Sequence, residues 1–264
     1  MKDVSVNIHD ANAPVKISCK DLTMTFVQKG THVVPVLDNV SIDVHDQELL
    51  VVLGPGQCGK TTLLRMIAGL ETPTNGTISL DGEEVTSPGP DRGLVFQSYM
   101  LFPWHTVEKN VSIGLEMKGL SHDDIQKTVS HYIQLVGLKG FEKYYPHQLS
   151  GGMKQRVGIA RAFAMSPKVM LMDEPFGQLD AQTRLFMEQE TERIWLQEKR
   201  TMVFVTNNID EALLLGDRIV TMEGKLPGRV KSSYVVDLPR PRDPMSIGFL
   251  TLRQTITDEQ ELTL

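Results

Sequence analysis

Short apolar runs alternate with stretches of helical spacing along most of this chain. The runs at Leu49–Leu53, 169–172 and 202–205 contain no charged residue, which is typical of parallel strands that are covered on both faces. Residues 62–70 place apolar side chains at helical spacing directly after the first of these runs. The pattern predicts an α/β fold built on a parallel sheet.

The regions around these runs follow different patterns. Residues 15–53 predict short antiparallel strands, and 98–165 lack strand alternation and predict helices. A short strand at 233–238 and a polar tail end the chain. We therefore expect one domain over 15–264, which divides into a core with a β flap (15–97 and 166–240), an inserted helical subdomain (about 98–165) and a C-terminal tail (241–264), after a flexible N-terminus (1–14).

Composition excludes several classes of protein. The chain has 264 residues, 41% of them apolar and 23% charged, and its net charge of −6 argues against a nucleic-acid partner. No apolar run approaches the roughly 20 residues that cross a bilayer, and residues 1–14 carry no apolar signal core. Two cysteines in such a chain predict a reducing compartment without disulfides. We expect any membrane association to depend on a partner.

A glycine-rich loop, GPGQCGKT at 54–61, lies between the first apolar run and the helical pattern. Gly54, Gly59, Lys60 and Thr61 match the phosphate-binding motif G-x-x-x-x-G-K-[ST], in which backbone N–H groups hold phosphates, the lysine reaches the β/γ-phosphates and the hydroxyl binds Mg²⁺. The remaining residues that we expect around ATP here are Pro55, Gly56, Gln57, Cys58 and Thr62. If the backbone at Gln57 has positive φ, this residue costs on the order of 1 kcal/mol relative to glycine.

Two carboxylates follow the apolar run at 169–172. Ligands of open α/β sheets bind at the carboxyl ends of the strands, where Asp173 and Glu174 fall. Asp173 is a candidate ligand for Mg²⁺, mostly through water. Glu174 is a candidate general base for the attacking water. A surface Asp-Glu pair at a strand end is the alternative, which the phosphate loop upstream makes less attractive.

The segment LSGGMKQR at 149–156, which we call the signature segment, ends a loop at Gly152 and enters a helix predicted over 153–165. Ser150 is suited to cap that helix, while Gly151 and Gly152 permit close approach of a ligand to the backbone. A hydroxyl, bare N–H groups and a helix dipole together make a second anion site. Two phosphate sites for one nucleotide are explained if two antiparallel copies of the chain sandwich ATP.

These motifs, in this order, resemble those of ABC transporter ATP-binding subunits, and most closely the import subunits of the nitrate, taurine and aliphatic sulfonate family. Further matching segments are VFQSYMLFPWHTVEKNV, MDEPFGQLDAQTR and the PGRV and DLPRPRD sequences near the end. The resemblance implies an ABC ATPase cassette, which is a P-loop NTPase core with an antiparallel flap and a helical insert. It also implies ATP hydrolysis with Mg²⁺, a homodimer, integral membrane permease subunits, a solute-binding protein, and a peripheral location at the cytoplasmic face of the membrane.

The resemblance also assigns individual residues. It makes Gln97 the glutamine that senses Mg²⁺ and the γ-phosphate, and Asp180 the aspartate of the segment that follows the carboxylates. It places Phe26 where an aromatic ring stacks on adenine, although a core residue on the alternating stretch Leu22, Met24, Phe26 is the second interpretation. It identifies residues 99–104 as a surface that receives a helix of the permease, although packing of these residues inside the helical subdomain is the second interpretation.

One position departs from the family pattern. Where the family has Thr-His-Asp after the strand at 202–205, this chain reads Thr206-Asn207-Asn208. The residue expected to contact the γ-phosphate is therefore Asn207, a shorter amide that cannot become cationic. Either turnover is weak, or Asn207 serves in an altered site.

Three functions remain open from the sequence. The first is a motor for import of a small anion such as nitrate, a sulfonate or taurine. The second is a soluble ABC-type ATPase not linked to transport, which would usually have a coiled-coil insertion or tandem cassettes. The third is an ATP-binding regulatory subunit with little hydrolysis, for which Asn207 is the argument.

Overall fold

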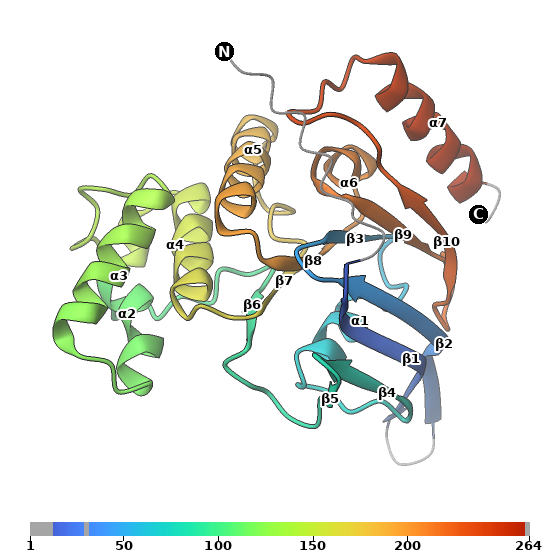
Figure 1. Ribbon diagram of the computed structural model, residues 1–264, viewed down its shortest axis with the longest axis horizontal. Coiled ribbons are helices and arrows are strands. Elements are labelled where there is room, and N and C mark those ends of the chain that lie inside the picture. The colour runs from blue at the N-terminus through green and yellow to red at the C-terminus, as the bar shows by residue number, and fades with distance from the viewer. Residues whose placement is uncertain (1–12, 29–31, 262–264) are drawn as a thin grey trace. The chain divides into compact units, whose positions relative to one another are not determined.

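The computed structural model describes residues 13–28 and 32–261, which form two compact units. The first unit contains the described residues up to Gly89 and those from Arg200 onward, and the second runs from Pro90 to Lys199. The chain thus leaves the first unit and returns to it, as it does around an insert. The predicted α/β class is confirmed, with strands and helices in both units (Figure 1).

An antiparallel flap belongs to the first unit. Its strands lie in the order β2-β1-β4-β5, with bounds β1 Val15–Gln28, β2 His32–His45, β4 Asn75–Leu80 and β5 Glu83–Glu84. β1 and β2 are longer than the short strands that the sequence predicts. Asp21 and Asn39 adopt positive φ near irregularities in the pairing, so that the side-chain alternation breaks without ending the strands.

Parallel strands form the centre of the same unit, in the order β10-β9-β3-β8. Buried β3 (Leu49–Leu53) pairs in parallel with β8 (Thr201–Thr206) and β9 (Arg218–Met222), whereas β10 (Val230–Val235) is antiparallel to β9. Helices α1 (Lys60–Ile67) and α6 (Ile209–Leu215) pack against these strands. β10 begins three residues before the strand that the sequence predicts at 233–238.

A C-terminal helix, α7 (Ile247–Glu261), occupies the region expected to be a polar tail. Within 247–260, the part of this helix whose burial the structure describes, only Phe249 and Ile256 are fully buried. Its sequence therefore lacks the broad apolar stripe by which a surface helix is recognised. The predicted flexible segment 1–14 lies outside the described residues apart from its last two positions. Of these, Pro14 accepts a hydrogen bond from the backbone N–H of Asp46.

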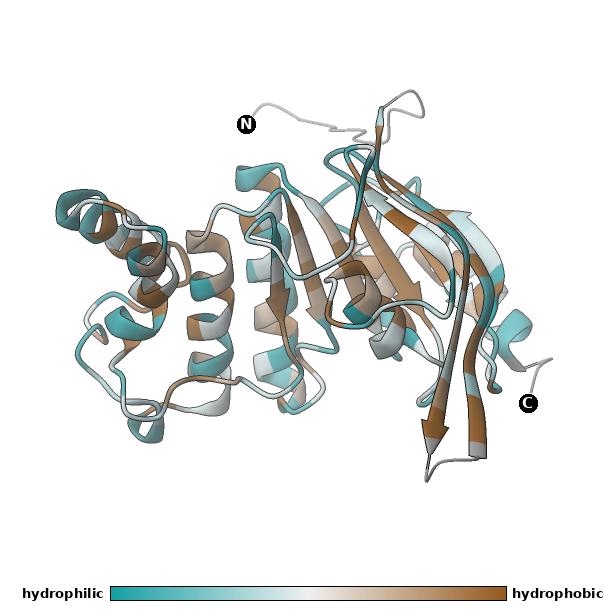
Figure 2. Ribbon diagram, turned by 90° about the horizontal axis from the view of Figure 1, so that it is seen from below, coloured by the Kyte–Doolittle hydropathy of each residue, from teal (hydrophilic) through white to brown (hydrophobic). Residues whose placement is uncertain are grey.

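The second unit consists mainly of helices. α2 (Val107–Met117), α3 (His122–Leu135) and α4 (Gly151–Ala164) pack on one another, and apolar residues lie along their inner faces (Figure 2). β6 (Arg92–Val95) pairs in parallel with β7 (Val169–Asp173), and α5 (Ala181–Glu198) follows. The unit therefore contains more than the predicted helical insert at about 98–165, because β6, β7 and α5 cluster with the helices.

Candidate nucleotide-binding site

The phosphate loop connects buried β3 to α1 in the first unit. The Gly54 N–H donates to the Thr206 carbonyl at 3.3 Å, which ties the start of the loop to the end of β8. Gln57 has φ +66° and Gly59 has φ +96°. The positive φ expected at Gln57 is therefore present, and this residue adopts a conformation that glycine adopts more readily.

Lys60 begins α1 and is 4% exposed. Its Nζ donates to the carbonyl oxygens of Gly54 and Pro55, at 2.8 Å each. The ammonium group is thus folded back over the loop, where the lysine of such a motif meets phosphate. The cap of α1 is Gly59, which provides no side-chain hydrogen bond to the first turn.

Cys58 is fully buried within the loop. A Cβ built on Gly54 would lie 2.9 Å from its sulfur, so the thiol points inward against the start of the loop. Cys58 therefore acts as a small packing residue, whereas Gly56 and Gln57 are exposed. The thiol offers no accessible target for alkylating reagents in the folded chain.

Gly228 packs against the phosphate loop at Cys58, a role that the sequence motifs above did not predict. A Cβ built there would lie 2.0 Å from the Cys58 carbonyl oxygen. The Gly228 N–H donates to Val36 at 2.9 Å, and its carbonyl accepts from Asp38 at 3.1 Å. The glycine of the PGRV sequence is the signal that could have predicted this close approach.

Asn207 also belongs to the phosphate-loop unit. It is exposed, and it lines a cavity of about 160 Å³ together with residues of the loop, of α6 and of α7. The complete lining is Leu53, Gly54, Pro55, Asn207, Ile209, Gly224 and Gln260. The fold thus brings the position of the expected γ-phosphate contact next to Gly54 and Pro55.

The carboxylate strand β7 lies in the second unit and ends at buried Asp173. Glu174 follows with φ +41°, a left-handed conformation that costs about 1 kcal/mol or more for a residue with a side chain. The Gly177 N–H donates to the Glu174 carbonyl at 3.2 Å. A Cβ on Gly177 would lie 3.6 Å from Nε2 of Gln97, so Gln97 and the turn after Glu174 are neighbours.

Ser150 caps α4, as the sequence predicts. Its hydroxyl accepts a hydrogen bond from the Met153 N–H at 3.3 Å. A Cβ on Gly151 would lie 2.8 Å from the Tyr99 hydroxyl, and one on Gly152 would lie 2.6 Å from Cγ2 of Thr183. The two glycines therefore bring the signature segment close to neighbours from 97–104 and from α5.

Asp180 caps α5 and accepts hydrogen bonds from the backbone N–H and the hydroxyl of Thr183. These hydrogen bonds hold the pKa of the Asp180 carboxyl below its ordinary value.

The predicted site residues divide between the two units. The phosphate loop and Asn207 belong to the first, and Gln97, the signature segment, Asp173, Glu174 and Asp180 belong to the second.

Comparison with known proteins identifies the family of this chain. The family model described as "ABC transporter" matches residues 37–177. The chain belongs to the ABC transporter family. An uncharacterized ABC transporter ATP-binding protein of Methanocaldococcus jannaschii is 51% identical over 97% of this chain and 94% of its own length.

Two further relatives are ATP-binding proteins of known import systems. The aliphatic sulfonates import ATP-binding protein SsuB of Bacillus licheniformis is 45% identical, covering 89% of this chain and 91% of its own. The nitrate import ATP-binding protein NrtD of Synechocystis sp. is 46% identical, covering 83% and 82%. A solved dimeric ATP-binding cassette in a post-hydrolysis state with ADP and phosphate has a TM-score of 0.74 at 30% identity, covering 83% of this chain and 98% of its own. The chain is an ABC ATPase with the P-loop NTPase fold.

Phe26 of this ABC ATPase lies on β1, opposite Val34 of β2. Leu22 and Met24 are buried, whereas Phe26 is half-buried. Its ring therefore retains an accessible surface, as an aromatic that stacks on a base requires. The adenine-stacking role stays a prediction.

The DLPRPRD sequence has a structural role in the ABC ATPase. The buried Arg242 guanidinium donates to the carbonyl oxygens of Leu213 and Gly216, and Arg240 donates to that of Leu215 and to Asp217. The two arginines thus satisfy carbonyl groups at the C-terminal end of α6 and complement the negative end of its dipole. They fix the helix that begins directly after Asn207 and Asn208.

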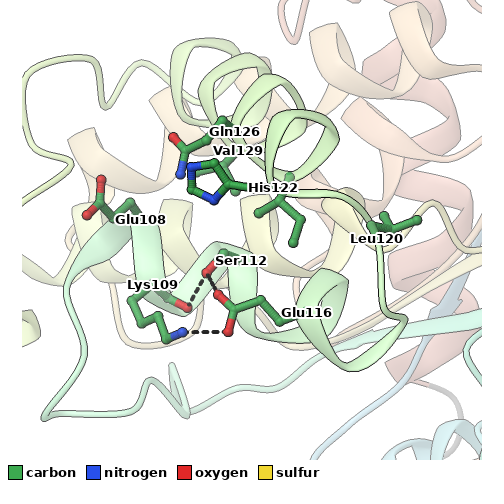
Figure 3. Close-up of a pocket in the computed structure, with 9 residues that line it drawn as sticks. Glu108, Lys109, Ser112, Glu116, Leu120, His122, Gln126 and Val129 are labelled. Carbon is green, nitrogen blue, oxygen red and sulfur yellow. Dashed lines mark hydrogen bonds and ion pairs between the residues drawn. The ribbon is translucent and has the colours of Figure 1, made fainter.

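A larger cavity, of about 360 Å³, lies between α2 and α3 (Figure 3). Three of its polar residues form hydrogen bonds with one another. Lys109 donates to Glu116 at 2.5 Å, and Ser112 donates to the same carboxylate at 2.7 Å. The hydrogen bond from Lys109 holds the pKa of Glu116 below its ordinary value. Two carboxylates, those of Glu108 and Glu116, line this cavity, so it is poorly suited to phosphate.

Membrane-spanning helices and metal-binding clusters are both absent from the described residues. In the part of the chain that the structure describes, no helix is both long and apolar enough to cross a membrane. Among the same residues, no group of three His, Cys, Asp or Glu side chains is arranged to hold a metal ion.

Proposed function

We propose that this ABC ATPase powers the import of a small anion, of the nitrate or organosulfonate class, through a membrane permease. The observation that carries the proposal is the open first turn of α1, with Lys60 folded over the phosphate loop. The import relatives, which match more than four-fifths of the chain, support the direction of transport and the class of substrate.

ATP binding follows from the loop chemistry. The N–H groups at the start of α1 and the Lys60 ammonium meet the phosphates, and Phe26 stacks on adenine. Thr61 and Asp173 supply the hydroxyl and carboxylate oxygens that suit Mg²⁺, with Gln97 as a further oxygen donor. When bound, Mg²⁺ neutralises charge on the phosphates.

Glu174 acts as the general base toward the attacking water. Glu174 directly follows β7, and ligands of open α/β sheets bind at this carboxyl end of the strands, which supports the role. Asn207 contacts the γ-phosphate through its amide N–H. Its place beside Gly54 supports that role.

A second copy of the chain completes the site. Ser150, Gly151 and Gly152 of one copy cover the γ-phosphate that the phosphate loop of the other copy binds, and Asp180 lies at the same interface. The solved dimeric cassette with ADP and phosphate supports this arrangement. ATP binding then closes the dimer, and hydrolysis releases it.

The permease binds the second unit at residues 99–104. Met100 is 59% and Trp104 68% exposed, whereas the other residues of the stretch except Pro103 are half-buried. Two exposed apolar side chains on a loop offer a docking surface. The ATPase thereby acts at the cytoplasmic face of the membrane, and a solute-binding protein delivers the anion to the permease.

Glu174→Gln tests the function, with Glu83→Gln at an exposed site on β5 as the matched control. We expect the first variant to bind ATP, to release phosphate about 10²–10³-fold more slowly, and to abolish uptake of labelled nitrate or alkanesulfonate in cells that lack the native chain. Parental uptake with Glu174→Gln would contradict the proposal. If the parental chain hydrolyses ATP in these cells but supports uptake of neither anion, the result would contradict the substrate class alone.

A further inference from the structure

The C-terminal helix α7 ends at the nucleotide site. Gln260, in its last turn, lines the cavity of about 160 Å³ that Asn207, Gly54 and Pro55 also line. These residues are far apart in sequence. α7 packs on α6 (Figure 1), and the last turn of α7 lines the same cavity as the phosphate loop. Asn207 and Gln260 therefore border the same small cavity beside the phosphate loop.

Several contacts hold α7 in this place. Phe249 and Ile256 are fully buried. Arg253 donates to Asp210 of α6 at 2.7 Å. Next to Gln260, the Glu259 carboxylate accepts from the Ser232 hydroxyl of β10, and the Glu259 carbonyl accepts from Lys231. The position of Gln260 is thus fixed by contacts on both sides of the helix.

The backbone on either side of Asn207 is similarly braced. The Thr206 hydroxyl donates to buried Glu211 at 2.5 Å and accepts from the Asn208 N–H at 3.0 Å. The Asn208 side chain caps α6 by accepting from the N–H groups of Asp210 and Glu211. Asn207 itself is exposed, and its short side chain borders the cavity, which leaves it space for several rotamers.

We propose that Gln260 is a positioning residue for Asn207, and that α7 thereby sets the turnover of the ATPase. Each amide carries both donor and acceptor groups, so the pair can form a hydrogen bond in the shared cavity. Such a bond restricts Asn207 to the rotamers from which its remaining N–H meets the γ-phosphate. The proposal rests on the proposed function, in which Asn207 has that contact.

The kinetic test uses Gln260→Ala, with Gln254→Ala as the matched control. Gln254 is an exposed glutamine of the same helix that donates to Asp258. We expect Gln260→Ala to lower kcat for MgATP by about five- to tenfold with little change in KM, because the contact is lost in the transition state. The control should leave both constants unchanged, and Gln260→Asn should recover part of kcat.

The double variant separates positioning from general damage. In an Asn207→Ala background, Gln260→Ala should lower kcat no further, because the residue that it positions is already absent. An equal loss in both backgrounds, or no loss in either, would overturn the proposal.

Hydrogen exchange of the nucleotide-free chain provides a readout that does not depend on hydrolysis. Gln260→Ala should speed the exchange of amides in 206–212 relative to the parent, and Gln254→Ala should not. If the parent protein hydrolyses no ATP, the proposed function fails while this measurement still decides the role of Gln260. Equal exchange in the two variants and the parent would count against that role.

Discussion

The first turns of α1 and α4 are both expected to meet phosphate, yet they are built differently. α1 begins after Gly59, which has φ +96° and gives the helix no side-chain cap. α4 begins after Ser150, whose hydroxyl accepts from the Met153 N–H. Of the helices in the described ranges, α2, α3, α5 and α6 are also capped by their own side chains.

The difference indicates two kinds of phosphate site. The uncapped turn of α1 offers its N–H groups to a ligand, and Lys60 adds a full charge, so this turn can bind a nucleotide within one chain. The capped turn of α4 has already satisfied one donor. It adds a hydroxyl and the remaining N–H groups, and its first three residues, 151–153, carry no charge. We therefore expect α1 to determine affinity and α4 to respond to a phosphate that another copy holds.

Lys60→Ala should have the largest effect. Removal of the ammonium should weaken ATP binding by at least about 100-fold, because the phosphate charge loses its main partner in a buried position. Isothermal titration measures the affinity, with Arg65→Ala, an exposed cation at the far end of α1, as the control. Equal ATP affinity of Lys60→Ala and the parent would show that Lys60 does not determine the affinity, contrary to the role expected for the first turn of α1.

Ser150→Arg should distinguish the role of the first turn of α4 from that of the first turn of α1. A bulky cation at the cap of α4 should leave the ATP affinity of the monomer within about twofold, since α1 alone binds the nucleotide. It should also prevent the ATP-dependent dimer, which light scattering in the Glu174→Gln background measures. Loss of monomer binding would mean that α4 acts on the nucleotide of its own chain.

Asn207→His should have a smaller effect, and in the opposite direction. The imidazole is longer than the amide of Asn207 and has room in the adjoining cavity, so its N–H donor lies closer to the γ-phosphate. We expect phosphate release to rise about tenfold with little change in affinity. The gain should vanish when Glu174 is Gln. An unchanged or slower rate would mean that Asn207 is adapted to its surroundings.

Gln57→Gly should have the smallest effect. The variant removes a side chain from a residue at φ +66° and should raise the free energy of unfolding by up to about 1 kcal/mol. The greater backbone entropy of glycine in the unfolded chain offsets part of this gain. Urea unfolding with Gly56→Ala as a control, at an open site, measures the difference. Clear destabilisation by Gln57→Gly would show that the Gln57 side chain contributes to the loop.

Local sequence determined the elements that carry the nucleotide motifs. β3 has the predicted bounds, and β7 and α4 differ from prediction by one or two residues. Continuous apolar runs and glycine-rich turns encode these elements within a few neighbouring residues, so no distant contact is needed to recognise them. The cap at Ser150 follows from the same local chemistry.

Only the tertiary structure decided how the loop and the residue beside it are supported. Gly228 approaches Cys58 from across the unit, and α7 places Gln260 beside Asn207. The sequence did not predict α7 because, among its residues with described burial, just Phe249 and Ile256 are fully buried. Its position depends on contacts such as that between Arg253 and Asp210. Contacts between distant segments leave no periodic pattern in the chain, because each needs only one or two residues on either side.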